Sequence, residues 1–262
     1  MVQDFMIQKE LIKKITQKKE FSQLPKKDVE MAFEKFDKEQ YCDEEKVKLT
    51  RDLLRKVFSA FTSQKILSLK DKDEEWILRK HLSTRERLPY YKELYGKLFE
   101  GFERGITIFD LGAGVNGFSH KYIENVIENF YYIGIEAMKQ LVDLMNYHFK
   151  SKNIYGKAIH ESLFELGKIK RLIKREKGRK VVFLFKTLDS LEMLQRDYSK
   201  KLLLEIVPLV DRIVVSFATK SFVKRTRFKA KRKWIIDFIE DNFEVLDDFE
   251  LGGERYVVFR KR

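Results

Sequence analysis

A glycine loop and a carboxylate further along are the residues of this 262-residue chain best suited to chemistry. Gly112 and Gly114 follow the apolar run ITIFDL, and Glu136 ends the next such run, YYIGIE. Glycines let the backbone turn tightly and approach a ligand closely. A carboxylate at the end of the neighbouring strand can accept hydrogen bonds from both ribose hydroxyls. The pattern therefore predicts a site for a ligand that contains ribose.

Two classes of cofactor fit this loop. Gly112, Gly114 and Gly117 satisfy the G-x-G-x-x-G spacing of nicotinamide dinucleotide sites. Asp110, two residues before the first glycine, instead gives the pattern D-x-G-x-G, which resembles motif I of S-adenosylmethionine-dependent methyltransferases. We expect S-adenosylmethionine, with Asp110, Gly112, Gly114 and Glu136 beside it.

The elements that must position this loop follow two patterns. Residues 1–104 show apolar residues at helical spacing and no alternation typical of strands. From residue 105 onward, short apolar runs alternate with amphipathic stretches, which predicts a parallel sheet covered by helices. Gly252-Gly253 joins two final strand-like runs, as in an antiparallel hairpin. We predict an all-helical domain over 1–104 and, over 105–262, the class I (Rossmann-like) α/β fold of methyltransferases.

Four segments in the same order resemble one family. STRERLP (83–89) is similar to the run that precedes the Rossmann-like domain in 16S ribosomal RNA guanine-N7 methyltransferases of the aminoglycoside-resistance type, the FmrO, Arm and Rmt group. GAGVNG resembles the family's glycine loop, and LFKTLDSLE and VVSFATKSF resemble its segments at strands four and five. The chain departs from the family pattern at Gly117 and Ala218, where the family has proline, and at Lys220, where it has arginine.

The resemblance implies methylation of a guanine N7 in 16S ribosomal RNA near the decoding site, with aminoglycoside resistance as the associated phenotype. Guanine N7 carries a free lone pair at neutral pH, so its attack on a sulfonium methyl group needs orientation and electrostatics but no general base. The family's extra helical domain implies that residues 1–104 bind RNA. The alternatives are a methyltransferase for another RNA or a small molecule, and an RNA-binding module without turnover.

The resemblance also implies roles for residues outside the glycine loop. Arg85 or Arg87 of the STRERLP run would pair with the methionine carboxylate of the cofactor. Glu161 or Ser162, after the third strand, lies where class I methyltransferases contact adenine. Lys186 and Ser216 end strands four and five, at the edge where such sheets bind ligands, and would line the target pocket.

Basic residues are concentrated around and after the segment VVSFATKSF (214–222). The chain has 54 Lys and Arg against 41 Asp and Glu, a net charge of +13, which suggests a polyanionic partner. A second basic cluster spans residues 168–180. Between Phe217 and Ile236 no acidic residue interrupts the cations, and we expect these to contact RNA phosphates: Lys220, Lys224, Arg225, Arg227, Lys229 and Lys231.

Composition excludes several other classes of protein. A single cysteine, Cys42, rules out a disulfide framework and a zinc site built from cysteines. No run approaches the roughly 20 apolar residues of a membrane span. We therefore expect a cytoplasmic protein that needs no metal. The family resemblance implies a monomer whose partner is ribosomal RNA or the 30S subunit.

Overall fold

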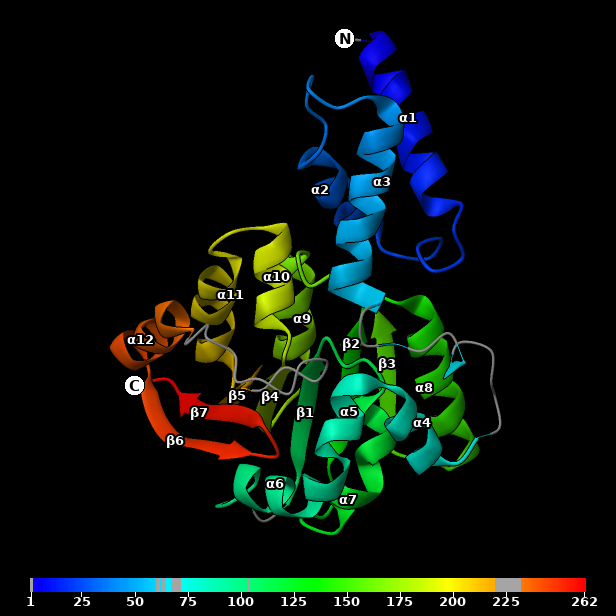
Figure 1. The fold of residues 1–262 in the computed structure, drawn as a ribbon. Helices are drawn as coiled ribbons and strands as arrows, with labels where there is room; N and C mark the ends of the chain where they lie inside the picture. Colours follow the sequence, from blue (N-terminus) through cyan, green and yellow to red (C-terminus); the bar gives the residue numbers. More distant parts are fainter. Residues whose placement is uncertain (1, 60–61, 63–64, 67–71, 103, 220–231) are drawn as a thin grey trace.

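The computed structural model describes residues 2–59, 62, 65–66, 72–102, 104–219 and 232–262. Its centre is a seven-stranded sheet in the order β3-β2-β1-β4-β5-β7-β6 (Figure 1). The first five strands pair in parallel, whereas β7 runs antiparallel to both β5 and β6. The strands are β1 Ile106–Leu111, β2 Tyr131–Glu136, β3 Gly156–His160, β4 Arg179–Phe185, β5 Arg212–Ala218, β6 Glu244–Leu251 and β7 Glu254–Arg260. This arrangement confirms the predicted class I fold.

The sequence dictates where the sheet is buried and where it turns back. Every residue of β1 is buried, as expected for a central parallel strand covered on both faces. The predicted hairpin is present, and Gly252 and Gly253 both have positive φ, 62° and 82°. Two positive φ values form the tight turn whose twist matches paired strands.

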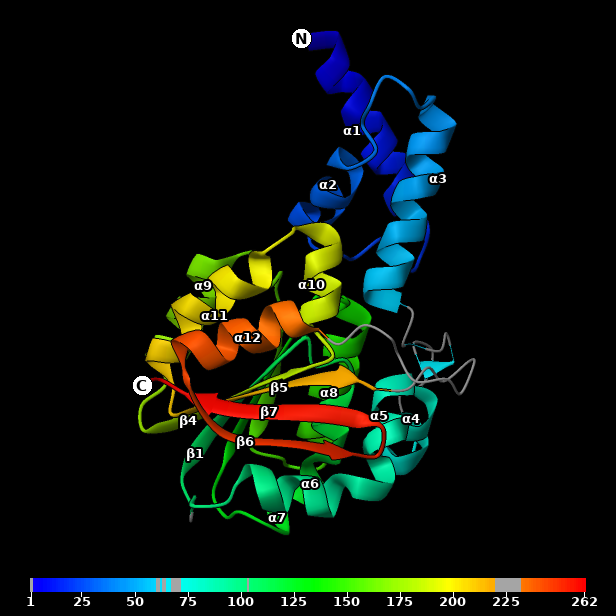
Figure 2. The same cartoon turned by 60° about the vertical axis from the view of Figure 1, so that its left-hand side comes forward.

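Helices cover both faces of the sheet. In Figures 1 and 2, α9–α12 lie on one side, and α6, α7 and α8 lie on the other. Their bounds are α6 Tyr91–Leu98, α7 His120–Glu124, α8 Lys139–Ser151, α9 Leu166–Arg175, α10 Leu188–Leu194, α11 Tyr198–Ile206 and α12 Lys233–Asn242.

The helices of the first hundred residues lie in two places. A helical arm projects beyond the sheet (Figure 2) and consists of α1 Val2–Thr16, α2 Lys26–Glu34, α3 Asp43–Leu54 and the π-helix η1 Arg55–Ser59. In contrast, α4 Glu74–Lys80, α5 Leu82–Arg87 and α6 pack beside the sheet. Tyr122 of α7 donates a hydrogen bond to Glu75 of α4, and Arg212 of β5 donates one to the Leu98 carbonyl. The division at residue 104 therefore stays a prediction. In the described ranges, no helix is both long enough and apolar enough to cross a membrane.

Candidate active site

A cavity of about 850 Å³, partly open to solvent, lies at the carboxyl ends of the parallel strands. This is the edge at which open α/β sheets bind ligands. Six residues expected from the sequence line the cavity: Arg87, Asp110, Gly112, Gly114, Glu136 and Lys186. Sequence reasoning missed others that line it, including Asp28, His81, Ser83, Asn116, Phe164 and Thr187.

The glycine loop allows close packing on both of its sides. Gly112 and Gly114 have φ values of 77° and 55°, a backbone conformation that L side chains rarely adopt. A Cβ at Gly112 would lie 2.8 Å from Oγ1 of Thr187, and one at Gly114 would lie 2.8 Å from Nε2 of His81. Burial lowers the pKa of His81 to about 3, so a neutral imidazole packs against the loop. The loop therefore presents bare backbone to the cavity.

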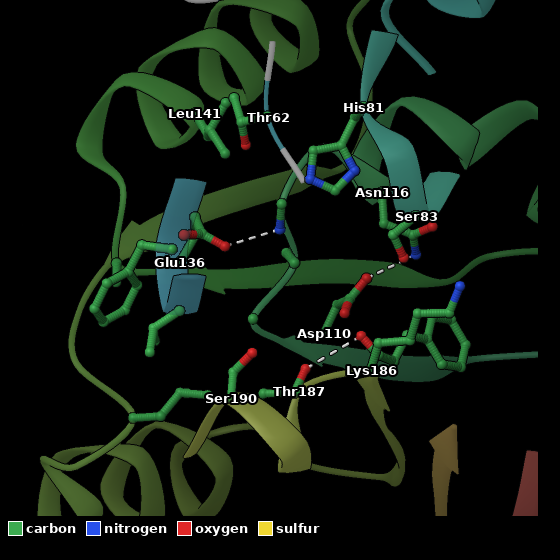
Figure 3. A pocket seen from close by; sticks show the side chains of 18 of the residues that line it. Thr62, His81, Ser83, Asp110, Asn116, Glu136, Leu141, Lys186, Thr187 and Ser190 are labelled. Atoms are coloured by element: carbon green, nitrogen blue, oxygen red, sulfur yellow. Dashed lines mark hydrogen bonds between the residues drawn. The ribbon is translucent and has the colours of Figure 1, made fainter. Parts of the chain in front are cut away.

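Glu136 holds the loop as well as facing the cavity. Its Oε2 accepts the backbone N–H of Gly114 at 2.8 Å (Figure 3), and its Oε1 accepts that of Met138 at 2.9 Å. Burial raises the pKa of the carboxyl group, while these backbone donors oppose the shift. Each oxygen can accept a further hydrogen bond, which suits a pair of ribose hydroxyls.

Arg87 lines the cavity, whereas Arg85 is exposed. The guanidinium of Arg87 donates to Oδ1 of Asn116 at 3.0 Å and to Ser83, and lies 3.4 Å from Glu254. Burial lowers the pKa of Arg87, but the charge of Glu254 and the three neighbouring tyrosines together outweigh burial and raise the pKa. A fixed, charged donor is thus available to an anionic group in the cavity. The geometry favours Arg87 over Arg85 as its partner.

Lys186 and Ser216 belong to a buried cluster of charges. The Lys186 ammonium lies 2.9 Å from Glu254 and contacts Glu86, and Ser216 donates a hydrogen bond to Glu254. The Ser216 hydroxyl also accepts the backbone N–H of Lys186, whose φ is 58°. Ser216 therefore holds the backbone of Lys186 in place and does not line the cavity itself. Their contact with a target nucleotide stays a prediction.

Asp110 and Asn116 form a polar network beneath the loop. The Asp110 carboxylate accepts from Asn116 Nδ2 and from the Tyr132 hydroxyl, both at 2.7 Å. Burial raises the pKa of Asp110, and these two donors oppose the shift. Because Asn116 also accepts from Arg87, the network orients the guanidinium at the cavity. Asparagine in the GAGVNG segment was the signal available in the sequence.

The two residues predicted at the adenine do not line the cavity themselves. Glu161 forms a 3.0 Å ion pair with Lys168, and Ser162 is fully buried. The residues that follow, Leu163 and Phe164, do line the cavity. The loop after β3 thus reaches the cavity one residue later than expected, and contact of Glu161 or Ser162 with a ligand stays a prediction.

The predicted RNA contacts fall on a part of the chain outside the described residues: Lys220, Lys224, Arg225, Arg227, Lys229 and Lys231. In the second basic cluster, Lys168 and Lys170 pair with Glu161 and Glu205. Arg171, Lys174 and Arg175 of the same helix are exposed. Among the described residues, no group of three or more His, Cys, Asp or Glu side chains could hold a metal ion.

The close contact at Gly114 predicts a large effect of one added methyl group. We expect Gly114→Ala to lower the free energy of unfolding by about 2 kcal/mol, because alanine resists this φ and its Cβ meets the buried His81 ring. Gly96→Ala is the control, since Gly96 lies in α6 with nothing within 4 Å of a new Cβ, and alanine there should stabilise the protein. Thermal unfolding measures both. Equal effects would show that the loop has room to adjust.

Two curated proteins with the same description are similar to this chain. The 16S rRNA (guanine(1405)-N(7))-methyltransferase of Micromonospora rosea is 28% identical over 149 residues, which are 56% of this chain and 50% of that protein. Its counterpart from Proteus mirabilis is 25% identical over 185 residues, 70% of this chain and 63% of that protein. The chain thus spans between half and two thirds of the length of these relatives.

Solved structures of methylases share the fold over nearly the whole chain. The 16S rRNA methyltransferase RmtF, in complex with S-adenosyl-L-homocysteine, has a TM-score of 0.77 at 20% identity and covers 97% of this chain and 98% of its own. An rRNA methylase from Escherichia coli has a TM-score of 0.75 at 21% identity, covering 97% and 99%. At these identities the likeness shows the fold.

The family is established by a match along the sequence. The model of the family described as "Ribosomal RNA methyltransferase (FmrO)" matches residues 47–246, which include the latter part of α3, the STRERLP run and all five parallel strands. The match confirms the resemblance of the four segments. This chain belongs to the FmrO family of ribosomal RNA methyltransferases.

Proposed function

We propose that this protein is an S-adenosylmethionine-dependent methyltransferase that modifies a guanine N7 of 16S ribosomal RNA near the decoding site. It acts as a cytoplasmic monomer on the RNA of the small ribosomal subunit. The observation that carries the proposal is the cavity, which is lined by Arg87, the glycine loop and Glu136. The chain that forms it belongs to a family of ribosomal RNA methyltransferases.

The cavity has the donors and acceptors that S-adenosylmethionine requires. Arg87 would bind the methionine carboxylate, and Glu136 would accept hydrogen bonds from the ribose hydroxyls. Gly112 and Gly114 line the cavity and would pass beside the cofactor. Leu141, Leu163 and Phe164 supply an apolar wall for a purine ring.

Methyl transfer requires these residues to align the methyl group of the cofactor with the target nitrogen. When bound, S-adenosylmethionine supplies a methyl group on a positively charged sulfur, which makes the carbon electrophilic. Arg87 and Glu136 would fix the methionine carboxylate and the ribose, on either side of the sulfur, so that the methyl group faces the target in line with the bond that breaks. Guanine N7 has no proton to lose, and no side chain has to act as a base. Lys186, at the end of β4, would help to place the target base.

The decisive experiment is methyl transfer to isolated 30S subunits with radiolabelled S-adenosylmethionine. Labelled RNA is then reduced with borohydride and cleaved with aniline, which breaks the chain at N7-methylguanosine. We expect cleavage at one guanine of 16S ribosomal RNA. Label in another RNA, or in a small molecule alone, would favour the alternative methyltransferases. RNA binding without cofactor binding would mean a module without turnover.

The role of Glu136 gives a prediction about affinity. Glu136→Ala should raise the dissociation constant for S-adenosylhomocysteine by about 30-fold, because two ribose hydroxyls lose a charged acceptor. Affinity for 30S subunits should stay within about twofold, since Glu136 is buried inside the cavity. Calorimetry measures the first and filter binding the second. A comparable loss of both affinities would contradict the assigned role.

The basic segment predicts a change in salt dependence. Replacing Lys224, Arg225 and Arg227 together by glutamine should weaken RNA binding and lower the slope of log affinity against log salt by about three units, one for each phosphate that is no longer neutralised. Filter binding across a salt series measures the slope. Replacing Lys150, Lys152 and Lys261, which are exposed and lie outside residues 1–104 and both basic clusters, gives a variant of equal charge for comparison. An unchanged slope in the first variant would mean that the segment is a solvated surface.

A further inference from the structure

A carboxylate from the helical arm closes one end of the cavity. Asp28 of α2 is 1% exposed and lines the cavity together with Glu136, Leu163 and Phe164. Its Oδ1 accepts a hydrogen bond from the Ser162 hydroxyl. Within the described part of the chain, its Oδ2 has no hydrogen-bond donor. An acidic side chain is thus buried at a ligand cavity with one acceptor still available.

The neighbouring contacts hold Asp28 rigidly in this position. The Ser162 hydroxyl that donates to Asp28 also accepts the backbone N–H of Phe164, at 3.1 Å. Lys27, the preceding residue of α2, donates to the Phe164 carbonyl at 2.9 Å and lies 3.2 Å from Glu165. Lys27 thus joins α2 to the loop after β3 through contacts that do not involve the Asp28 carboxylate.

The order of strands decides which part of a nucleoside would meet Asp28. The sheet edge runs from β3 through β2 and β1 to β4. Glu136 at the end of β2 would hold the ribose, and Lys186 lies beyond the glycine loop at the end of β4. A ligand with its carboxylate at Arg87 and its ribose at Glu136 places its base over the end of β3. Asp28 faces the cavity at this end, beside Leu163 and Phe164.

From this juxtaposition we infer that Asp28 is a binding residue for the adenine base, and that its Oδ2 accepts a hydrogen bond from the exocyclic 6-amino group. This inference rests on the proposed function. An ionised carboxylate only accepts hydrogen bonds, and the 6-amino group is the hydrogen-bond donor of adenine. A site built around a buried acceptor disfavours an analogue that leaves the acceptor unpaired. The helical arm therefore contributes to recognition of the cofactor base.

The test compares two ligands by calorimetry at pH 8.5. One is S-adenosylhomocysteine, and the other is its 6-deamino analogue, in which hydrogen replaces the amino group. The intact protein should bind the first about 10- to 100-fold more tightly, as expected for a hydrogen bond to a charged group. Asp28→Ala should bind the two ligands with affinities within about threefold of each other. Asp28→Asn, which keeps an acceptor oxygen, should retain an intermediate preference.

Lys27→Ala is the matched control, because it removes the docking contacts of the same helix and leaves Asp28 in place. It should weaken both ligands by the same factor and keep the preference. The inference is overturned if the intact protein shows no preference, or if Asp28→Ala and Asp28→Asn keep it in full while both bind with weakened affinity. Failure of the intact protein to bind S-adenosylhomocysteine at all would overturn the proposed function as well.

Discussion

Arg87→Gln should raise the dissociation constant for S-adenosylmethionine by about 100-fold, because a paired, charged donor is replaced by a neutral amide. It should also lower the free energy of unfolding by about 3 kcal/mol or more, since the buried Glu254 keeps Lys186 but loses the cationic partner Arg87. Calorimetry and chemical denaturation measure the two effects.

Arg85→Gln provides the matched control, since Arg85 lies two residues away in the same helix and is exposed. It should change the dissociation constant by less than about twofold. Arg87→Lys separates charge from geometry, because lysine keeps the charge and loses the planar pair of donors. We expect it to unfold less readily than Arg87→Gln and still bind the cofactor about 10-fold more weakly than the intact protein. Normal affinity in both Arg87 variants would remove Arg87 from the site.

Asp28→Asn should make the ligand-free protein more stable than the intact protein above pH 7, and little different near pH 4. Burial raises the pKa of Asp28 to about 7, and the charges of Glu136 and Glu161 add to the shift. Ser162 and Lys27 oppose it, and Tyr198 of α11 also faces this group. The folded protein therefore binds this proton more tightly than the unfolded chain does.

Ionisation of Asp28 destabilises the folded protein. A raised pKa in the folded state gives stability that is complete below about pH 4 and is lost as the pH rises through about 7. The full loss is at most about 4 kcal/mol, the free energy equivalent of the shift. Urea denaturation from pH 4 to 8.5 should show a steeper decline in the intact protein than in Asp28→Asn, in which Asp110 and Glu136 still contribute a loss of the same sign. The same decline in both would mean that Asp28 is ionised without penalty.

The local pattern of the sequence predicts the glycine loop and the strands around it. The runs 106–111 and 131–136 are β1 and β2 with the predicted bounds, because a buried parallel strand is a short apolar run that ends in glycine or charge. The position of Glu136 beside the glycine loop then follows, because two neighbouring parallel strands end at the same edge of the sheet. These features depend on neighbours in sequence, so the sequence alone is enough to find them.

Contacts between distant segments could not be predicted in the same way. Asp28 reaches the cavity from the helical arm, and Glu254 reaches Arg87 and Lys186 from the final hairpin. Nothing in the residues around Asp28 distinguishes it from other acidic residues in amphipathic helices. The choice between Arg85 and Arg87 depends on which face of α5 packs inward. Arg87 lies one helical turn after the buried Ser83 and shares its inward face, which only the packing of α5 reveals.

The wall that α2 gives to the cavity has a thermodynamic consequence. A ligand that binds there also favours the docked position of the helical arm, because Asp28 and Lys27 move with the same helix. Coupling between two binding sites is reciprocal. If a ligand in the cavity raises the affinity of the arm for a partner by some factor, the bound partner must raise the affinity of the cavity for that ligand by the same factor. Cofactor affinity measured with and without 30S subunits would then report cooperativity between the two substrates from either side.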